Sequence, residues 1–139
     1  WYKSPFIESG INFNTAEQYM MFHKALLFGD TDIAEQILLE KQPSIQKELG
    51  KQVKNFDIDL WVKFREEIVI KGNLLKFQQN TSLFTLLVGT GNKIIVEASP
   101  VDRIWGVGLH YEDDLILDEK NWKGLNLLGK CLMEVRSRL

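Results

Sequence analysis

Apolar side chains return every three or four positions along most of this chain, and the runs are separated by Gly, Pro, Asp or Asn. This spacing predicts α-helices, because residues three and four apart share one helix face. The residues that start and stop helices set the expected limits. The expected helices run from Thr15 to Phe28-Gly29-Asp30, from Asp30 or Thr31 to before Pro43, over residues 43–50, from Asp57 or Asp59 to Gly72, and over residues 73–79, 82–88 and 126–138.

The first of these helices has the clearest start. Thr15 followed by Gln18 fits a capping box, and Asn14 with Glu17 is the alternative pair. Apolar residues then cover much of the helix circumference, as expected of a buried helix.

Only one segment reads clearly as a strand. Residues 93–98 contain the β-branched run Ile94, Ile95 and Val96, which predicts a short buried strand. Residues 1–13 are expected to be irregular or weakly extended, with a turn signal at Ser9-Gly10. With at most one or two weaker strands besides, we expect a compact, mainly helical α+β fold in one domain over residues 1–139.

The overall charge gives little indication of function. Lys plus Arg number 17 and Asp plus Glu 19, giving a net charge of −2. A protein steered to DNA by phosphate charge is usually basic, so a local nucleotide pocket fits better than bulk DNA binding. Cys131 is the single cysteine, which excludes an intramolecular disulfide and favours an intracellular, cytoplasmic location. No apolar run has the length of a membrane span.

The segment Glu97–Leu109 gathers chemically useful residues. Asp102, Arg103 and Trp105 follow the turn signal at Ser99-Pro100, and Gly106 and Gly108 come directly after. A carboxylate, a guanidinium and an indole beside two glycines suit a charged, planar ligand. The alternative is a surface loop with an Asp–Arg pair and a tryptophan that fills the core.

The first helix offers a second set. Glu17 and Lys24 are seven residues apart. Seven steps of about 100° bring both side chains to nearly the same face, about 10 Å apart, which is too far for a direct pair but suits the two ends of one ligand. The alternatives are a carboxylate that stabilises the helix dipole and a lysine whose stem covers apolar surface.

Common enzyme signatures are missing from the sequence. It contains no Gly-rich dinucleotide motif, no Walker A motif and no nucleophile elbow. Two histidines, His23 and His110, with one cysteine do not make a common zinc site, so we expect neither a metal nor a cofactor. His23 faces another side of the helix than Lys24 and is expected to be structural.

Seven segments together resemble the NADAR, or YbiA-like, family. Their order and spacing cover nearly the whole chain, and the family's upstream element is expected just before Trp1. The matching segments are Ser4–Phe6, Phe13–Met21, Lys24–Asp30, Lys51–Phe56 leading to Trp61, Lys76-Phe77, Glu97–Leu109 and Trp122–Arg136.

The resemblance implies a YbiA-like domain with a small sheet and an N-glycoside hydrolase activity. Two substrate branches are implied. One is ADP-ribose attached to guanine, in a nucleoside or in DNA modified by an ADP-ribosyltransferase toxin, which gives a toxin–antitoxin setting. The other is a ribosylated pyrimidine phosphate of riboflavin synthesis. A module that binds ADP-ribose without cleaving it is the non-enzymatic alternative.

N-glycoside cleavage gives the matching residues roles. An oxocarbenium-like sugar needs negative charge near C1′, so Glu17 and Asp102 are the expected acids, in either order. Lys24 is expected to act directly, either as a cation or as a Schiff-base nucleophile. The expected substrate contacts are Trp105 by stacking, Arg103 by phosphate binding, Trp61 and Gly106. Single-stranded DNA is a further expected partner, and the surface lysines proposed to contact it are Lys41, Lys47, Lys51 and Lys54.

Overall fold

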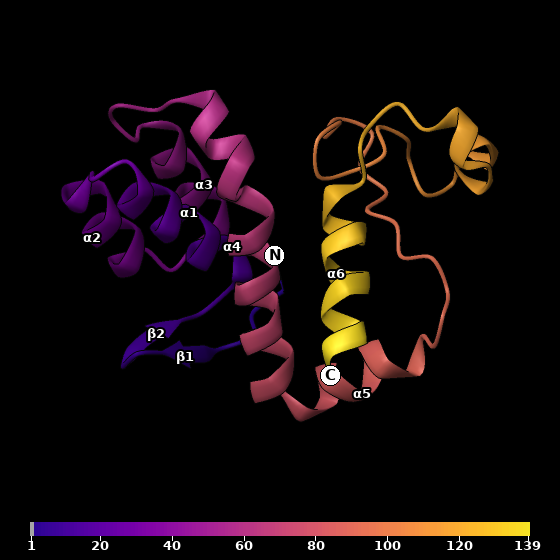
Figure 1. The fold of residues 1–139 in the computed structure, drawn as a ribbon, viewed down its shortest axis with the longest axis horizontal. Helices are drawn as coiled ribbons and strands as arrows, with labels where there is room; N and C mark the ends of the chain where they lie inside the picture. Colours follow the sequence, from indigo (N-terminus) through magenta and orange to yellow (C-terminus); the bar gives the residue numbers. More distant parts are fainter. Residues whose placement is uncertain (1) are drawn as a thin grey trace. The chain divides into compact units, whose positions relative to one another are not determined.

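The computed structural model describes residues 2–139, so Trp1 lies outside the described residues. Residues up to Leu87 form one compact unit, and Val88–Leu139 form a second. Figure 1 shows both along the sequence colours, from indigo to yellow. The described residues contain six α-helices and one two-stranded sheet, which confirms the mainly helical α+β class.

The helices and strands follow most of the expected limits. The first unit contains β1 (Phe6–Glu8), β2 (Ile11–Phe13), α1 (Ala16–Leu27), α2 (Thr31–Leu39), α3 (Pro43–Lys51) and α4 (Ile58–Gln79). The helix α5 (Thr81–Gly89) runs from the first unit into the second. The second unit then contains the 3₁₀ turns η1 (Asp114–Leu117) and η2 (Glu119–Asn121) and the helix α6 (Leu127–Arg138).

The sheet lies where the sequence predicted irregular or weakly extended chain. Ser9 and Gly10 both have positive φ, 49° and 79°, which is the two-residue turn that suits a β-hairpin. Phe6 pairs with Phe13 across the hairpin, and their rings stack 5.5 Å apart. Both rings are buried in the core of the first unit, where Phe13 also packs edge-on against Tyr19 of α1.

The expected helix end at Gly72 is wrong. The helix α4 continues through it to Gln79, so residues 73–79 are not a separate helix. Gly72 lies against the ring of Tyr19, and a Cβ there would come within 2.9 Å of the Tyr19 Cε1 atom. The glycine therefore allows α4 to approach α1 closely, and it does not terminate the helix.

The expected strand over residues 93–98 is also wrong, since no ladder forms there. Its backbone groups are satisfied by side chains of the second unit instead. Asn126 accepts from Glu97 N at 2.9 Å and donates to Ile95 O at 3.0 Å, while Arg136 donates to Lys93 O at 2.8 Å. The β-branched residues favoured extended chain correctly, but no partner strand is present to pair with it.

Candidate active site

The N-terminus of α1 is held firmly, which fixes the first turn that carries Glu17. Thr15 caps the helix by accepting from Gln18 N at 3.0 Å, as the capping box predicted. The Gln18 side chain accepts from Asn14 N and donates to carbonyls at the end of α2, including Ile37 O at 3.0 Å. Because these groups are buried or half-buried, they fix the position of the helix start relative to α2.

Lys24, two turns further along α1, has an aromatic surrounding. Its ammonium lies 4.8 Å from the Phe56 ring centre and 5.5 Å from that of Trp61, a buried residue of α4. Both distances are within the range of cation–π attraction. The sequence singled out Trp61 but missed Phe56, whose position in the turn before α4 gave no periodic signal.

The sequence placed Glu17 and Lys24 on one helix face, and the Glu17 carboxylate acts electrostatically on the Lys24 amine. Burial lowers the pKa of Lys24, and the Glu17 carboxylate opposes that shift in part. Desolvation disfavours the ammonium, so a larger share of Lys24 is neutral than for an exposed lysine. The rings of Phe56 and Trp61 are the aromatic groups near this amine.

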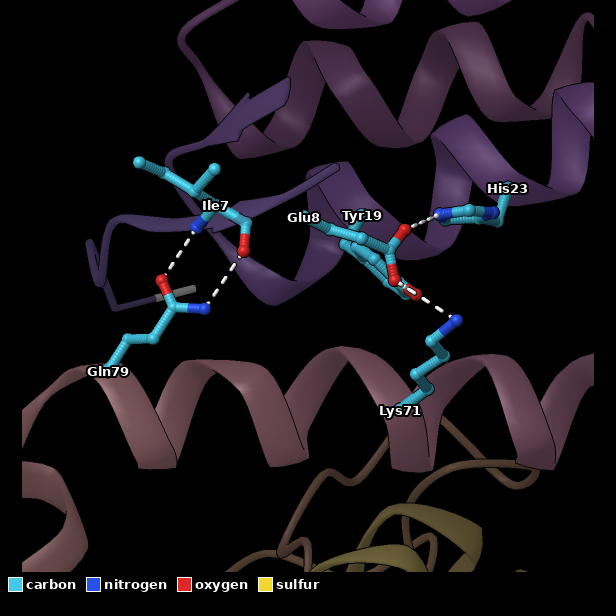
Figure 2. A network of polar contacts seen from close by, with 6 residues as sticks. All are labelled: Ile7, Glu8, Tyr19, His23, Lys71 and Gln79. Carbon is cyan, nitrogen blue, oxygen red and sulfur yellow. Dashed lines mark hydrogen bonds and ion pairs between the residues drawn. The ribbon is translucent and has the colours of Figure 1, made fainter. Parts of the chain in front are cut away.

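A polar network on another face of α1 explains His23. Figure 2 shows the Glu8 carboxylate of β1 between three partners. It accepts from the Tyr19 hydroxyl at 2.9 Å, and it lies 3.0 Å from His23 Nε2 and 3.3 Å from the Lys71 ammonium of α4. The hairpin, α1 and α4 are thus joined through one carboxylate.

The pKa values of Glu8 and His23 are both lowered in this network, for different reasons. Burial alone would raise the pKa of Glu8, but the hydrogen bond from Tyr19 and the charges of Lys71 and His23 together hold it below its ordinary value. Burial lowers the pKa of His23 despite the nearby Glu8 carboxylate. The contact between His23 and Glu8 of β1 supports the predicted structural role of His23.

The edge of the hairpin is closed by the same long helix. Gln79, at the end of α4, accepts from Ile7 N at 2.8 Å and donates to Ile7 O at 2.9 Å (Figure 2). The Gln79 amide therefore satisfies the two backbone groups of Ile7 that a neighbouring strand would otherwise bind.

In the second unit, Asp102 organises its own loop. Its Oδ1 accepts from Ile104 N at 2.9 Å and from Trp105 N at 2.8 Å. These two bonds fix the orientation of the carboxylate and hold the half-buried Trp105 close to it. The structure records this turn in place of the Asp102–Arg103 ion pair that was the alternative.

Close backbone approach explains Gly106. A Cβ there would lie 2.8 Å from Asp102 O and 3.0 Å from Glu97 O. Val107 N donates to Glu97 O at 3.0 Å, and Asn126 N donates to Gly106 O at 3.1 Å. The loop is consequently tied to its own start and to the start of α6, while the Arg103 side chain is exposed.

Asn126 precedes α6, but its side chain does not cap that helix. It sits at the N-cap position of α6 with φ 52°, but its side chain makes no capping bond. The side chain instead pairs with residues 95 and 97, as described above. Asn126 is buried and has a positive φ, and neither property can be predicted from the sequence because both depend on the folded chain.

The predicted site residues therefore form two sets. Glu17, Lys24 and Trp61 come together in the first unit. Asp102 and Trp105 share one turn of the second unit, with Arg103 and Gly106 in the same loop. Among residues 2–139, no three His, Cys, Asp or Glu side chains gather where they would hold a metal ion. No described helix combines the length and apolar character that crossing a membrane requires.

The model of the NADAR domain family matches residues 1–139, across both units. The chain belongs to the NADAR family. The predicted family is confirmed.

Relatives of this NADAR chain include named glycosidases. N-glycosidase R617 of Acanthamoeba polyphaga mimivirus is 52% identical over 123 residues, which are 88% of this chain and 72% of that protein. The NMR structure of the E. coli protein YbiA superimposes with a TM-score of 0.78 at 27% identity, covering 98% of this chain and 73% of YbiA. The YbiA-like fold is thereby confirmed, and the similarities support an N-glycosidase of the NADAR family.

A plant relative carries a different name. Riboflavin biosynthesis protein PYRR, chloroplastic, of Zea mays is 28% identical over 132 residues. Those residues are 90% of this chain but 19% of the maize protein.

Proposed function

We propose that the chain is an N-glycosidase that cleaves the bond between ribose C1′ and the nitrogen of an ADP-ribosylated guanine, in a nucleoside or in DNA, and so reverses the modification. The observation that carries the proposal is the pair Glu17 and Lys24 on α1. The acid and the amine interact, and burial makes the amine less basic. These are the two group types that N-glycoside cleavage through C1′ employs.

In the proposed reaction, the bond from C1′ to guanine breaks and its electron pair leaves with the base, which takes a proton from Glu17 or Asp102. A neutral Lys24 amine forms a bond to C1′, and a proton passes from its nitrogen to the ring oxygen. The bond between that oxygen and C1′ then breaks, which opens the sugar ring and leaves a protonated imine. Water then adds at C1′ and releases ADP-ribose and the free amine. In the alternative, Lys24 remains a cation that holds substrate oxygens, and water attacks C1′ directly.

The remaining predicted residues take binding roles in this proposal. Trp105 stacks on a base, a contact of about 1–3 kcal/mol. Arg103 and Trp61 hold other parts of the substrate, and the backbone at Gly106 contacts it closely. No cofactor or metal takes part, and a cytoplasmic location remains part of the proposal.

The test is a turnover assay on ADP-ribosylated guanosine, free and in single-stranded DNA. Wild type is expected to release ADP-ribose, and Glu17→Gln to lose nearly all release. Borohydride then separates the two roles of Lys24, since only a protonated imine is trapped as a stable adduct. An adduct that disappears in Lys24→Arg supports the nucleophile, whereas an active enzyme without adduct supports the cation.

A ribosylaminopyrimidine phosphate of riboflavin synthesis is the second candidate substrate, favoured by the similarity to the maize protein. If wild type leaves the ADP-ribosylated guanosine intact and cleaves this substrate, the second candidate replaces the first. Binding of ADP-ribose without turnover of either substrate, unchanged in Glu17→Gln, would indicate the non-catalytic module instead.

Exposed lysines support DNA as a partner of the first unit. All four lie outside the hydrophobic core, on or beside α3: Lys41, Lys47, Lys51 and Lys54. Replacing them with glutamine is expected to slow turnover of the DNA substrate and to reduce the salt dependence of that turnover. Turnover of the free nucleoside should not change. Equal losses on both substrates would argue against a DNA-binding role.

A further inference from the structure

Arg65 of α4 is a buried arginine whose Nε atom has no hydrogen-bond partner among residues 2–139. The residue as a whole is only 9% exposed. A guanidinium keeps its charge in proteins, so it cannot avoid the cost of burial by losing a proton. A buried polar donor that lacks a hydrogen-bond partner is also unfavourable, so a buried guanidinium is normally held by acceptors. Such a group indicates that an anion completes its surroundings.

The position of Arg65 on α4 links it to the proposed site. Arg65 follows Trp61 by four residues, which places it one turn further, about 6 Å along the same helix face. The Trp61 ring lies 5.5 Å from the Lys24 ammonium, and Gly72 on the same buried face lies against Tyr19. Arg65 therefore lies between two points at which α4 meets α1.

The other candidate for an anion contact fits less well. Arg103 is exposed on its loop and loses little by remaining in water. A planar guanidinium inside the protein, in contrast, offers directed donors that match a phosphate with two parallel hydrogen bonds.

We propose that Arg65 binds the phosphate of the substrate, beside the sugar that reacts at Lys24. The inference rests on the proposed function, because both candidate substrates carry phosphate on the ribose. The ligand chemistry is a phosphate ester, and its source is either a diphosphate, as in ADP-ribose, or a monophosphate, as in ribose 5-phosphate.

Calorimetric titrations with ADP-ribose, ribose 5-phosphate and ribose test the proposal on the full chain. Arg65→Met is expected to weaken binding of the preferred phosphate probe about 10- to 100-fold, because a charge-assisted hydrogen bond is lost. Arg65→Lys keeps the positive charge but lacks the planar donors of the guanidinium. Its affinity for the phosphate probe is expected to lie between those of wild type and Arg65→Met. Lys63→Met, an exposed cation on the same helix, is the matched control and should bind like wild type. The probe that responds identifies the diphosphate or the monophosphate.

Thermal unfolding without ligand gives a second readout. If Arg65 awaits a ligand, Arg65→Met leaves the melting temperature unchanged or raises it, since a buried Nε donor without a partner is removed. Unchanged affinity for both phosphate probes in Arg65→Met overturns the proposal, and so does the absence of binding by wild type at millimolar probe. A lower melting temperature with unchanged affinity would make Arg65 a structural residue.

The two proposals fail separately. If ADP-ribose binding depends on Arg65 but ADP-ribosylated guanosine is not cleaved, the proposed reaction fails and the phosphate contact stands. If wild type and Arg65→Met cleave that substrate with the same KM, the reaction stands and the phosphate contact fails.

Discussion

The two sets of site residues are positioned by different means. In the first unit, Lys24 and Trp61 belong to regular helices, and α1 meets α4 through close contacts such as Gly72 on Tyr19. In the second unit, Asp102 and Trp105 lie in a loop without helix or strand, fixed by hydrogen bonds. Changes in helix packing should therefore displace the residues of the first set, whereas loss of individual hydrogen bonds should displace those of the second.

The largest effect is expected where the loop carboxylate is changed without disturbing its turn. Asp102→Asn keeps an oxygen that accepts from Ile104 and Trp105, so the free energy of unfolding should change by less than about 0.5 kcal/mol. If the carboxylate acts on the sugar or base, kcat should fall about 10²- to 10⁴-fold. Steady-state kinetics and urea unfolding measure the two, and full activity in the folded variant would remove Asp102 from the catalytic residues.

The second largest effect is expected at Asn126, whose side chain binds the backbone of residues 95 and 97 at the start of this loop. Asn126→Ala removes two hydrogen bonds and leaves the backbone at Ile95 and Glu97 unpaired. Because these are buried or half-buried groups, the free energy of unfolding should fall by about 2–4 kcal/mol. Urea unfolding measures it, with Asn121→Ala at an exposed position as the control. If Asn126→Ala and the control lose the same free energy of unfolding, water makes the hydrogen bonds of the Asn126 side chain in its absence.

The helical unit should respond to an added methyl group. Gly72→Ala improves helix propensity by about 1 kcal/mol, yet the new Cβ meets the Tyr19 ring. We expect a net destabilisation of about 1–3 kcal/mol, since overpacking outweighs propensity. Gly89→Ala, where a Cβ meets nothing within 4 Å, is the matched control and should not destabilise. A more stable Gly72→Ala variant would contradict close packing of α1 on α4.

The smallest effect distinguishes charge from packing in the first unit. The pKa of Glu8 is lower folded than unfolded, so its charge stabilises the fold above the unfolded value of 4.5, and this contribution disappears as pH falls through the folded value. Glu8→Gln should thus cost about 1 kcal/mol at pH 7 and less as the pH falls below 4.5. Unfolding curves of both proteins between pH 7 and pH 3 measure this. A difference independent of pH would assign the contribution to shape alone.

Local signals in the sequence were enough to predict several features. The Thr15 cap, the helix stop at Gly29 and the cap at Asp30 depend on neighbouring residues, and all three were found. That Glu17 and Lys24 share one helix face across two turns followed from helix geometry. The family pattern added residues of the loop that periodicity does not select.

Errors arose where a distant residue decides the outcome. Gly72 carries the signature of a helix end, but the ring of Tyr19, far away in sequence, gives the glycine another use. The run Ile94–Val96 carries the signature of a strand, but Asn126 and Arg136 supply its partners. Propensity describes what a segment prefers, and the partner determines what it forms.

The sequence by itself determined the helical α+β class, most of the helix starts and the family, and it selected the acids and the amine that remain proposals. Only the tertiary structure decided that Phe56 and Trp61 surround Lys24, that Glu8 joins the hairpin to two helices, and that Arg65 is buried with an unpaired Nε. The physical reason is that caps and periodicity act over a few residues, whereas desolvation and charge pairing depend on groups that meet only in the folded chain.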